Sequence, residues 1–456
     1  MNVKSAQSVF MFKSFAFRIF IVALVLRLIP VILARGLGIG LDDMFQYDML
    51  ARSIVAGNGF RWYAQEDLSL LASFVDFDFS TVKEYDPMLG VPTSFRAPLY
   101  PSFLALIYFF SGTGFSRFFA ARLAQAILLG APLALLTYWV AHRLFPLSSF
   151  LNDAGERNNE QAARIAAWVV ACYPMLLVYP LGLGTENPFF ILLLTSIFLL
   201  LSSINKPSAF HFLLSGFFLG LTALTRSVIL PFAGLAILWA WLVLRQYRGA
   251  IFIALAFALT ISPWIIRNSL LHHKLTGIET SMGYNLYLGY HPQGNGSFVF
   301  GPSLDLLTIL DDAERDRLGT QKAIEFIYAQ PERFIPLAVD RLGFFFGLEK
   351  RVLMYFYSNN IIGYIPLPVL LTISAILLLP FVNISCSAAL GLSLLRWKPE
   401  HILLGLLFIS CRGSRHREQI SWFDNAQLGR DIVNILRRRE CCLNSGNNGS
   451  TGSSIA

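Results

Sequence analysis

Long apolar runs recur along this chain of 456 residues, and they constrain its fold more than any other feature. A helix needs roughly 20 apolar residues to cross the hydrocarbon core of a bilayer. Charged residues make up only 14% of the chain, well below the share of about a quarter that is usual in soluble proteins. The sequence therefore predicts an all-α integral membrane protein with about nine to eleven spans. The runs lie near 16–35, 119–141, 163–182, 187–204, 209–225, 228–244, 249–266 and 361–382, with less distinct ones at 384–395 and 400–411.

One further apolar run, 97–111, decides the predicted topology. It is short and has prolines in its first turns, so both a short span and a helix lying along the interface are open. If the N-terminus is cytoplasmic and this run does not cross, the basic connections between later spans fall inside, as the positive-inside rule requires. We therefore expect a juxtamembrane helix at 97–111. The basic residues concerned are Arg143, Arg157, Arg164, Lys206, Arg245 and Arg248.

This topology puts two long polar loops, 36–118 and 267–335, on the non-cytoplasmic face, together with the turn 184–188 and Arg226. Both loops are expected to be partly folded. Apolar and small residues at helical spacing predict a helix over 42–56, which the turn Gly57-Asn58-Gly59 ends. In the second loop, helices are expected at 311–317 and 323–328, and Pro331 should break the helix before Phe334.

The expected organisation is a cytoplasmic N-terminus at 1–15, a membrane domain at 16–411 and a polar tail at 412–456. The tail is basic at first and then rich in Asn, Gly and Ser, a composition typical of disorder. The basic residues elsewhere are scattered between apolar runs, so nucleic acid is not an expected partner. The five cysteines have no metal-ligand spacing.

Asp42 and Asp43 stand at the mouth of the first span, where a helix is expected to begin. One interpretation is that they cap this helix and interact with its dipole. The other is that a carboxylate pair at the membrane edge acts as a general base or orients a nucleophile. Asp48 lies on a different part of the helix, and we expect it on the solvated surface.

Three arginines, Arg96, Arg226 and Arg267, come from separate segments that face the same compartment. Each could be a side chain that reaches the lipid headgroups from a helix end. Together they suit an anionic headgroup, because a guanidinium presents a planar fork of donors to phosphate. Arg27, inside the first span, is expected to have a partner in the protein interior.

Glu186 lies in the tight turn between two spans. It either caps the next helix or stands beside Asp42 and Asp43 as a second acid or a metal ligand. A divalent metal is therefore left open. The stretch from Met282 to Pro292 mixes glycine, aromatic residues and Asn285, so it could hold a sugar face or form a packed loop.

The order of these motifs resembles the GT-C superfamily of polytopic glycosyltransferases, and most of all its protein O-mannosyltransferase and aminoarabinose-transferase branch. The likeness covers roughly residues 10–395. It begins with the first span, followed by Asp-Asp-x-x-x-Tyr-x-x-x-Ala and a Gly-x-Gly turn. Its motifs are Asp42, Asp43, Tyr47, Ala51, Gly57 and Gly59, then Arg96-Ala-Pro-Leu-Tyr-Pro101, Thr185-Glu186, the run 221–226, Pro263-Trp-Ile-Ile-Arg-Asn268, the stretch 283–289, Gln330-Pro331 and Arg341.

This resemblance implies a GT-C-type bundle with juxtamembrane helices on the outer face of the plasma (inner) membrane. It also implies a hexosyl- or pentosyltransferase that uses a polyprenyl-phosphate-linked sugar. Asp42 or Asp43 would be catalytic, and the membrane-edge arginines would bind the donor phosphate. Glu186, Tyr47, Tyr284 and Asn285 would be a second acid or substrate contacts. The site would face the periplasm or exterior, and the acceptor would be a glycan, a lipid or a protein.

Two other classes of function remain open at this stage: a transporter or flippase for a lipid-linked sugar, and a non-catalytic protein that binds it. A transporter of this kind should show interrupted helices near mid-membrane in two related halves. Here the polar residues gather at one face and no half-repeat is visible. Family members usually continue through more spans, whereas this chain turns polar after Cys411, so a truncation or frameshift is one interpretation of its end.

Overall fold

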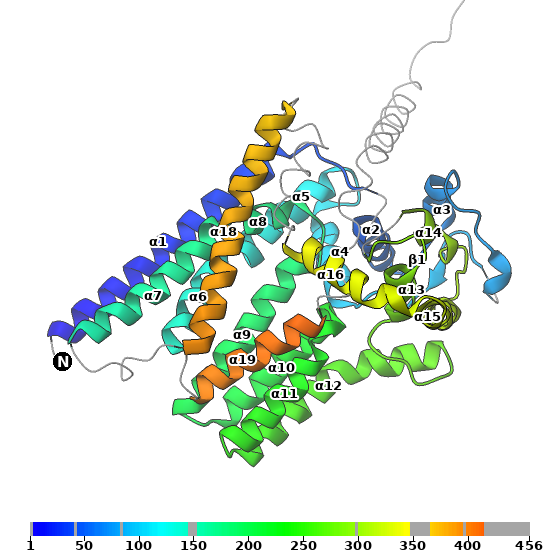
Figure 1. Ribbon diagram of the computed structural model, residues 1–456. Coiled ribbons are helices and arrows are strands. Elements are labelled where there is room, and N and C mark those ends of the chain that lie inside the picture. Colours follow the sequence, from blue (N-terminus) through cyan, green and yellow to red (C-terminus); the bar gives the residue numbers. More distant parts are fainter. Residues whose placement is uncertain are drawn as a thin grey trace, which may run out of the picture.

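The computed structural model describes residues 3–40, 43–82, 85–144, 153–296, 300–346, 365–394 and 398–414 (Figure 1). Among these residues, five helical segments are long and apolar enough to cross a membrane, which confirms the all-α, multi-span prediction. They lie in α1 (Val3–Leu33), α5–α6 (Ser116–Ala124 and Ala131–Leu144, joined by the π-helical turn Gln125–Gly130), α9 (Glu186–Asn205), α12 (Tyr247–Leu271) and α18 (Leu367–Leu394).

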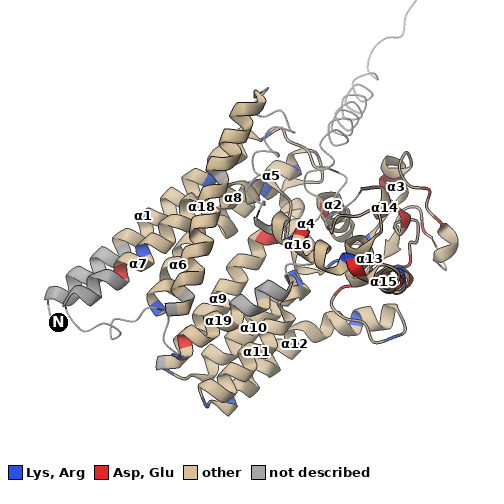
Figure 2. Ribbon diagram, viewed as in Figure 1, with Lys and Arg blue, Asp and Glu red and all other residues tan. Residues whose placement is uncertain are grey.

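Further helices complete the bundle. They are α7 (Asp153–Cys172), α8 (Pro174–Val178) with the 3-10 turn Tyr179–Leu181, α10 (Ala209–Thr225), the 3-10 turn Ser227–Ile229 with α11 (Leu230–Leu238) and the π-helical turn Trp239–Val243, and α19 (Pro399–Ser414). Along most of these helices Figure 2 shows few charged residues.

Two of the expected apolar runs differ in shape or extent from the helices that the structure shows. The run 163–182 is not one straight helix, because α7 and the segment that follows it are bent by 51° at the break before Pro174. Proline has no backbone N–H and its ring crowds the preceding turn, so it bends a helix at this point. The run 384–395 is not a separate element either, since α18 continues through Pro380 to Leu394.

The break before Pro174 accounts for Arg27. Without an N–H at Pro174, the carbonyl of Val170 lacks its usual helical donor. Arg27 donates to the carbonyl oxygens of Val170 at 2.9 Å and Ala171 at 3.3 Å, and to Ala23 of its own helix at 3.1 Å. Its side chain passes directly over Gly130, where a Cβ would clash with it. The expected interior partner is thus the backbone of α7.

Four apolar clusters hold the described residues together, and the smallest of them is formed by Val31, Ala34, Ala126 and Leu181. One joins α1, α6 and α7, and a second joins α9, α10, α11, α12 and α19. The third lies in the cap, the name used below for the described residues of 43–111 and 276–346 (Figure 1). The cap sits at one end of the helices, where the chain leaves α1 and α12.

The cap contains the folded segments expected in the two long loops. The helix predicted over 42–56 is confirmed from Asp43 to Val55, and Gly57 and Gly59 end it with positive φ angles. The stretches 311–317 and 323–328, expected to be helical, are parts of one continuous helix, Asp312–Ala329. The elements are α2 (Asp43–Val55), β1 (Arg61–Trp62) paired with β2 (Val91–Pro92), α3 (Gln65–Leu71), the 3-10 turn Phe79–Thr81, α4 (Leu99–Ser111), α13 (Met282–Tyr290), α14 (Phe300–Asp305), α15 (Asp312–Ala329), the 3-10 turn Pro331–Arg333 and α16 (Phe334–Phe346).

Helix α4 corresponds to the run 97–111. One face packs on α2 and the cap core through Tyr100, Leu104 and Tyr108. The opposite face exposes Phe109 and Phe110, at 72% and 79% of their surface. Such a half-buried apolar helix suits a position along the membrane interface, so the juxtamembrane placement stays a prediction that this packing favours.

Glycines allow α10 and α12 to approach closely. A Cβ on Gly216 would collide with the backbone carbonyl of Ile253, and one on Gly220 would meet Thr260. These glycines form the small-xxx-small spacing that lets helix backbones touch in membranes. The contact matters to the site described below, because α10 ends at Arg226.

Gly216→Ala should therefore destabilise the protein by about 1–3 kcal/mol, because the backbone of α12 has to move. Gly234→Ala is the matched control: Gly234 also lies in a helix, but nothing lies near its added Cβ. The control should be neutral or stabilising by up to about 1 kcal/mol. Thermal unfolding of both purified variants in detergent measures the difference, and equal unfolding midpoints would contradict this packing.

Candidate functional site

Two arginine–carboxylate pairs from four separate segments form the candidate site. In the first pair, Arg96 donates to the carboxylate of Asp43, which opens α2. Arg96 also donates through Nε to Gln46 Oε1 at 2.8 Å. Burial by itself would lower the pKa of Arg96, but the charge of Asp43 raises the pKa above its usual value. Arg96 is therefore a fixed cation beside the start of α2.

The second pair joins Glu186, in the first turn of α9, to Arg226, at the C-cap of α10, at 2.9 Å. The two helices are antiparallel neighbours joined by a short turn. The positive end of the α9 dipole and the negative end of the α10 dipole therefore lie at the same level. The positive end of α9 favours an acid and the negative end of α10 favours an arginine. The Glu186–Arg226 ion pair puts the favoured charge at each end.

Tyr47 lies beside the first pair and within electrostatic reach of the second. Its side chain is 6% exposed, and its ring is 5.3 Å from the Arg96 guanidinium carbon. Burial raises the pKa of Tyr47 to about 12, and the charges of Arg96, Asp43, Arg226 and Glu186 all act on it. The hydroxyl therefore stays protonated at neutral pH and is a neutral donor close to the ion pairs. All five of these residues were predicted to have a role in the site: Asp43 in catalysis, Arg96 and Arg226 in phosphate binding, Glu186 as a second acid and Tyr47 as a substrate contact.

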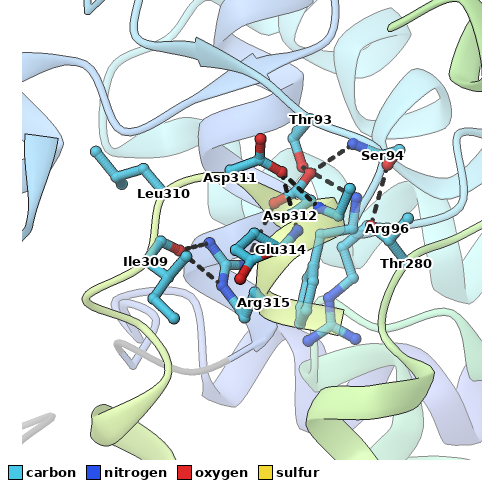
Figure 3. A network of polar contacts seen from close by, with 12 residues as sticks. Thr93, Ser94, Arg96, Thr280, Ile309, Leu310, Asp311, Asp312, Glu314 and Arg315 are labelled. Carbon is cyan, nitrogen blue, oxygen red and sulfur yellow. Dashed lines mark hydrogen bonds and ion pairs between the residues drawn. The ribbon is translucent and has the colours of Figure 1, made fainter. Parts of the chain in front are cut away.

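A buried polar network holds the segment that carries Arg96 (Figure 3). Asp312, at the start of α15, accepts from Thr93 Oγ1 at 2.5 Å and from the Ser94 N–H at 2.7 Å. Arg315 lies beside Asp312 and donates to the carbonyl of Ile309 at 2.6 and 2.9 Å. Because every group in the network is buried, moving any one of them would leave a charge or donor unpaired. The second long loop thus fixes the position of the first.

The same stretch is held from α12. The hydroxyl of Ser94 lies 2.6 Å from His272 Nε2 and 3.0 Å from Thr280 Oγ1. The Thr280 N–H donates to the Ser94 carbonyl at 3.0 Å. Arg96 is therefore anchored on both sides, which leaves it little freedom to turn away from Asp43.

The remaining predicted residues lie in different settings. Arg267 donates to the carbonyls of Thr93 at 2.5 Å and Phe60 at 3.3 Å, and it stacks on Trp264. These contacts tie α12 to the cap. They do not favour the predicted role of Arg267 as a phosphate ligand, which stays a prediction.

Tyr284 is buried in α13, and its hydroxyl donates to the Ser303 carbonyl at 3.0 Å. Asn285 is half-buried on the same helix. Substrate contacts by these two residues stay predictions. Asp42 lies outside the described residues.

Asp48 is not on the surface, so that expectation is wrong. Its carboxylate is 1% exposed and accepts from Arg117 at 2.7 Å, Arg52 at 2.9 Å and the Tyr108 hydroxyl at 3.0 Å. Arg52 also pairs with Asp67 at 2.6 Å. Burial opposes ionisation, but the two arginines outweigh it and lower the pKa of Asp48. Asp48 does lie on a different side of α2 from Asp43, as expected, but α4 and α5 cover that side.

Sequence reasoning missed three residues that build the site. Glu279 accepts from the hydroxyl of Ser227, the neighbour of Arg226, and its charge acts on Arg96. Arg122 is fully buried and donates to the carbonyls of Gly38 at 2.7 Å and Leu181 at 2.7 Å, which fixes the approach to α2. A charge inside an apolar run marked Arg122, whereas nothing in the sequence marked Glu279.

The π-helical turn positions the third missed residue, Gln125. Its Oε1 accepts from the Tyr100 hydroxyl at 2.8 Å, and its Nε2 donates to the carbonyls of Pro180 and Gly182, both at 3.1 Å. Tyr100 in turn packs edge-on against Tyr47, with ring centroids 5.0 Å apart. Gln125 therefore connects Tyr47 to the turn that leads into Glu186.

Within the described part of the chain, no three His, Cys, Asp or Glu side chains come together as a metal site. The carboxylates of Asp43 and Glu186 are both engaged by arginines instead.

No family model matches this chain, and no curated protein matches it either. A crystal structure of ArnT from Cupriavidus metallidurans bound to undecaprenyl phosphate is similar to it. The likeness covers 93% of this chain and 78% of that one, with 13% identity and a TM-score of 0.39. A likeness at this level does not define a family.

Asp48→Asn should lower the free energy of unfolding by about 3 kcal/mol at neutral pH, because it leaves the largely buried Arg117 without a carboxylate and removes one of the two carboxylates that pair with Arg52. The folded pKa of Asp48 is lowered, so its stabilisation is present above the unfolded pKa and is lost as the pH falls through the folded pKa. The gap between wild type and variant should therefore close only in acid.

Unfolding followed by tryptophan fluorescence across this pH range checks the prediction. Asp76→Asn is the control, because Asp76 is an exposed carboxylate in the same loop. If Asp48→Asn unfolds at the wild-type midpoint at neutral pH, the buried cluster does not stabilise the cap.

Proposed function

We propose that this chain is a GT-C-type membrane glycosyltransferase. It moves a sugar from a polyprenyl-phosphate donor to an acceptor on the non-cytoplasmic face of the plasma membrane. The observation that carries the proposal is the gathering of the Arg96–Asp43 and Arg226–Glu186 pairs around Tyr47. Arginines supply donors for a phosphate, and carboxylates supply bases for an acceptor, so the set contains both halves of a transfer reaction.

The position of the site supports a lipid-linked donor. Glu186 and Arg226 lie at the ends of two apolar helices, and the apolar α4 follows Arg96. A polyprenyl tail could lie among such helices while its phosphate meets the arginines at their ends. A water-soluble sugar nucleotide would not need this arrangement.

The chemistry then divides between the two kinds of side chain. The acceptor hydroxyl or amine attacks the anomeric carbon and gives its proton to Asp43. The bond from that carbon to the phosphate oxygen breaks, and the electron pair leaves with the polyprenyl phosphate. Arg96 and Arg226 stabilise the charge that develops on this leaving group. Attack opposite the leaving group inverts the configuration at the anomeric carbon.

Glu186 and Tyr47 have supporting roles in this scheme. Glu186 holds Arg226 in place, and the protonated Tyr47 donates to a sugar or phosphate oxygen between the arginines. Tyr284 and Asn285 would contact the sugar from α13. The particular sugar, hexose or pentose, and the acceptor follow from contacts made when both substrates are bound.

Asp43→Asn should keep the fold but lower the rate of transfer by about a hundredfold or more, because the amide cannot accept the acceptor proton. Membranes that express the chain are incubated with a panel of radiolabelled polyprenyl-phosphate sugars, and donor consumption is measured. Asp76→Asn should retain the wild-type rate. Full activity of Asp43→Asn would remove Asp43 from the role of base.

Arg226→Ala should weaken binding of undecaprenyl phosphate by about tenfold or more, since a charge-assisted contact to the phosphate is lost. Titration of the purified protein with undecaprenyl phosphate gives the dissociation constant. Arg317→Ala is the matched control, because Arg317 also pairs with a glutamate, Glu314, but on the exposed surface of the cap. Equal affinity of Arg226→Ala and wild type would exclude Arg226 from the phosphate site.

A further inference from the structure

The two arginines of the site are already occupied by carboxylates. Arg96 donates to Asp43 and Gln46, and Arg226 pairs with Glu186. Both arginine side chains are largely buried, with 16% and 13% of their surface exposed. A phosphate that binds in the same place must therefore compete for donors that the carboxylates hold.

The charges of the group make this competition strong. Asp43, Glu186 and Glu279 bring three negative charges to two arginines, which leaves a net charge of minus one. A sugar phosphodiester adds another negative charge. Like charges that stay close together in a water-poor site repel one another strongly, so the donor cannot simply join the existing pairs.

The carboxylates differ in how easily they can move. Asp43 is 28% exposed and stands at the first residue of α2, whereas Glu186 is 17% exposed. Arg96, in contrast, is held by the network of Thr93 and Ser94 around Asp312. Asp43 is thus the partner that can turn toward water while Arg96 stays in place.

We propose that the donor phosphate displaces Asp43 from Arg96, and that this exchange switches on the base. While Asp43 is paired, the guanidinium of Arg96 occupies its carboxylate, which is then not available to the acceptor. Once the phosphate takes over Arg96, the released carboxylate of Asp43 turns to the acceptor and can accept its proton. The donor therefore binds first, and proton transfer to Asp43 becomes effective only in its presence. This inference rests on the proposed function.

Affinity for undecaprenyl phosphate tests the exchange directly, with the full chain in detergent. Removing the competing charge should tighten binding, so Asp43→Asn should lower the dissociation constant by about threefold or more while transfer is lost. Asp43→Ser is a second variant that removes the same charge. Asp76→Asn, which changes an exposed carboxylate, should bind like wild type.

A double-mutant cycle separates displacement from an indirect effect on the fold. The gain from Asp43→Asn should disappear in an Arg96→Ala background, because no arginine is left to be shared. Wild-type binding with unchanged or weaker binding by both Asp43 variants would overturn the exchange but leave the proposed function intact. A wild-type chain that does not bind undecaprenyl phosphate would overturn the proposed function and the exchange together.

Discussion

The need to pair every buried charge shapes this molecule. A guanidinium or carboxylate within or beside apolar helices is strongly disfavoured unless another group meets it. Arg27 and Arg122 meet backbone carbonyls, Asp48 meets two arginines, and Asp312 meets Thr93 and Ser94. In each case at least one partner comes from a segment distant in sequence, so the pairing also sets how those segments are arranged.

The site uses the same rule with one difference. Its pairs stand at helix ends and keep a small exposed area, whereas Asp48 and Arg315 are almost completely enclosed. A pair that is enclosed can only stabilise, but a pair at the edge can exchange its partner for a ligand. Function is therefore concentrated at the partly exposed ion pairs, and the enclosed networks hold the segments that carry those pairs in position.

Sequence patterns were sufficient to predict the helices and the helix ends at which polar residues gather. Apolar runs predicted the spans, and Gly57 and Gly59 predicted the end of α2, because length and backbone freedom are local properties. Asp48 was misplaced because its burial depends on α4 and α5, which periodicity within α2 cannot include. Glu279 was missed for a related reason: it sits in an irregular segment, and only the fold brings it to Ser227. The pairing of particular acids with particular arginines likewise depends on tertiary contacts.

The link between Arg27 and α7 has a consequence for how the protein is made. The carbonyls that receive Arg27 lie 143 and 144 residues further along the chain. When α1 first leaves the ribosome, its guanidinium can reach only the Ala23 carbonyl of its own helix, and an arginine within a span costs up to about 2.5–3.5 kcal/mol on insertion. The first helix can therefore settle fully only after α7 has been synthesised. Membrane integration of this chain is a cooperative event, in which an early segment waits for a later one.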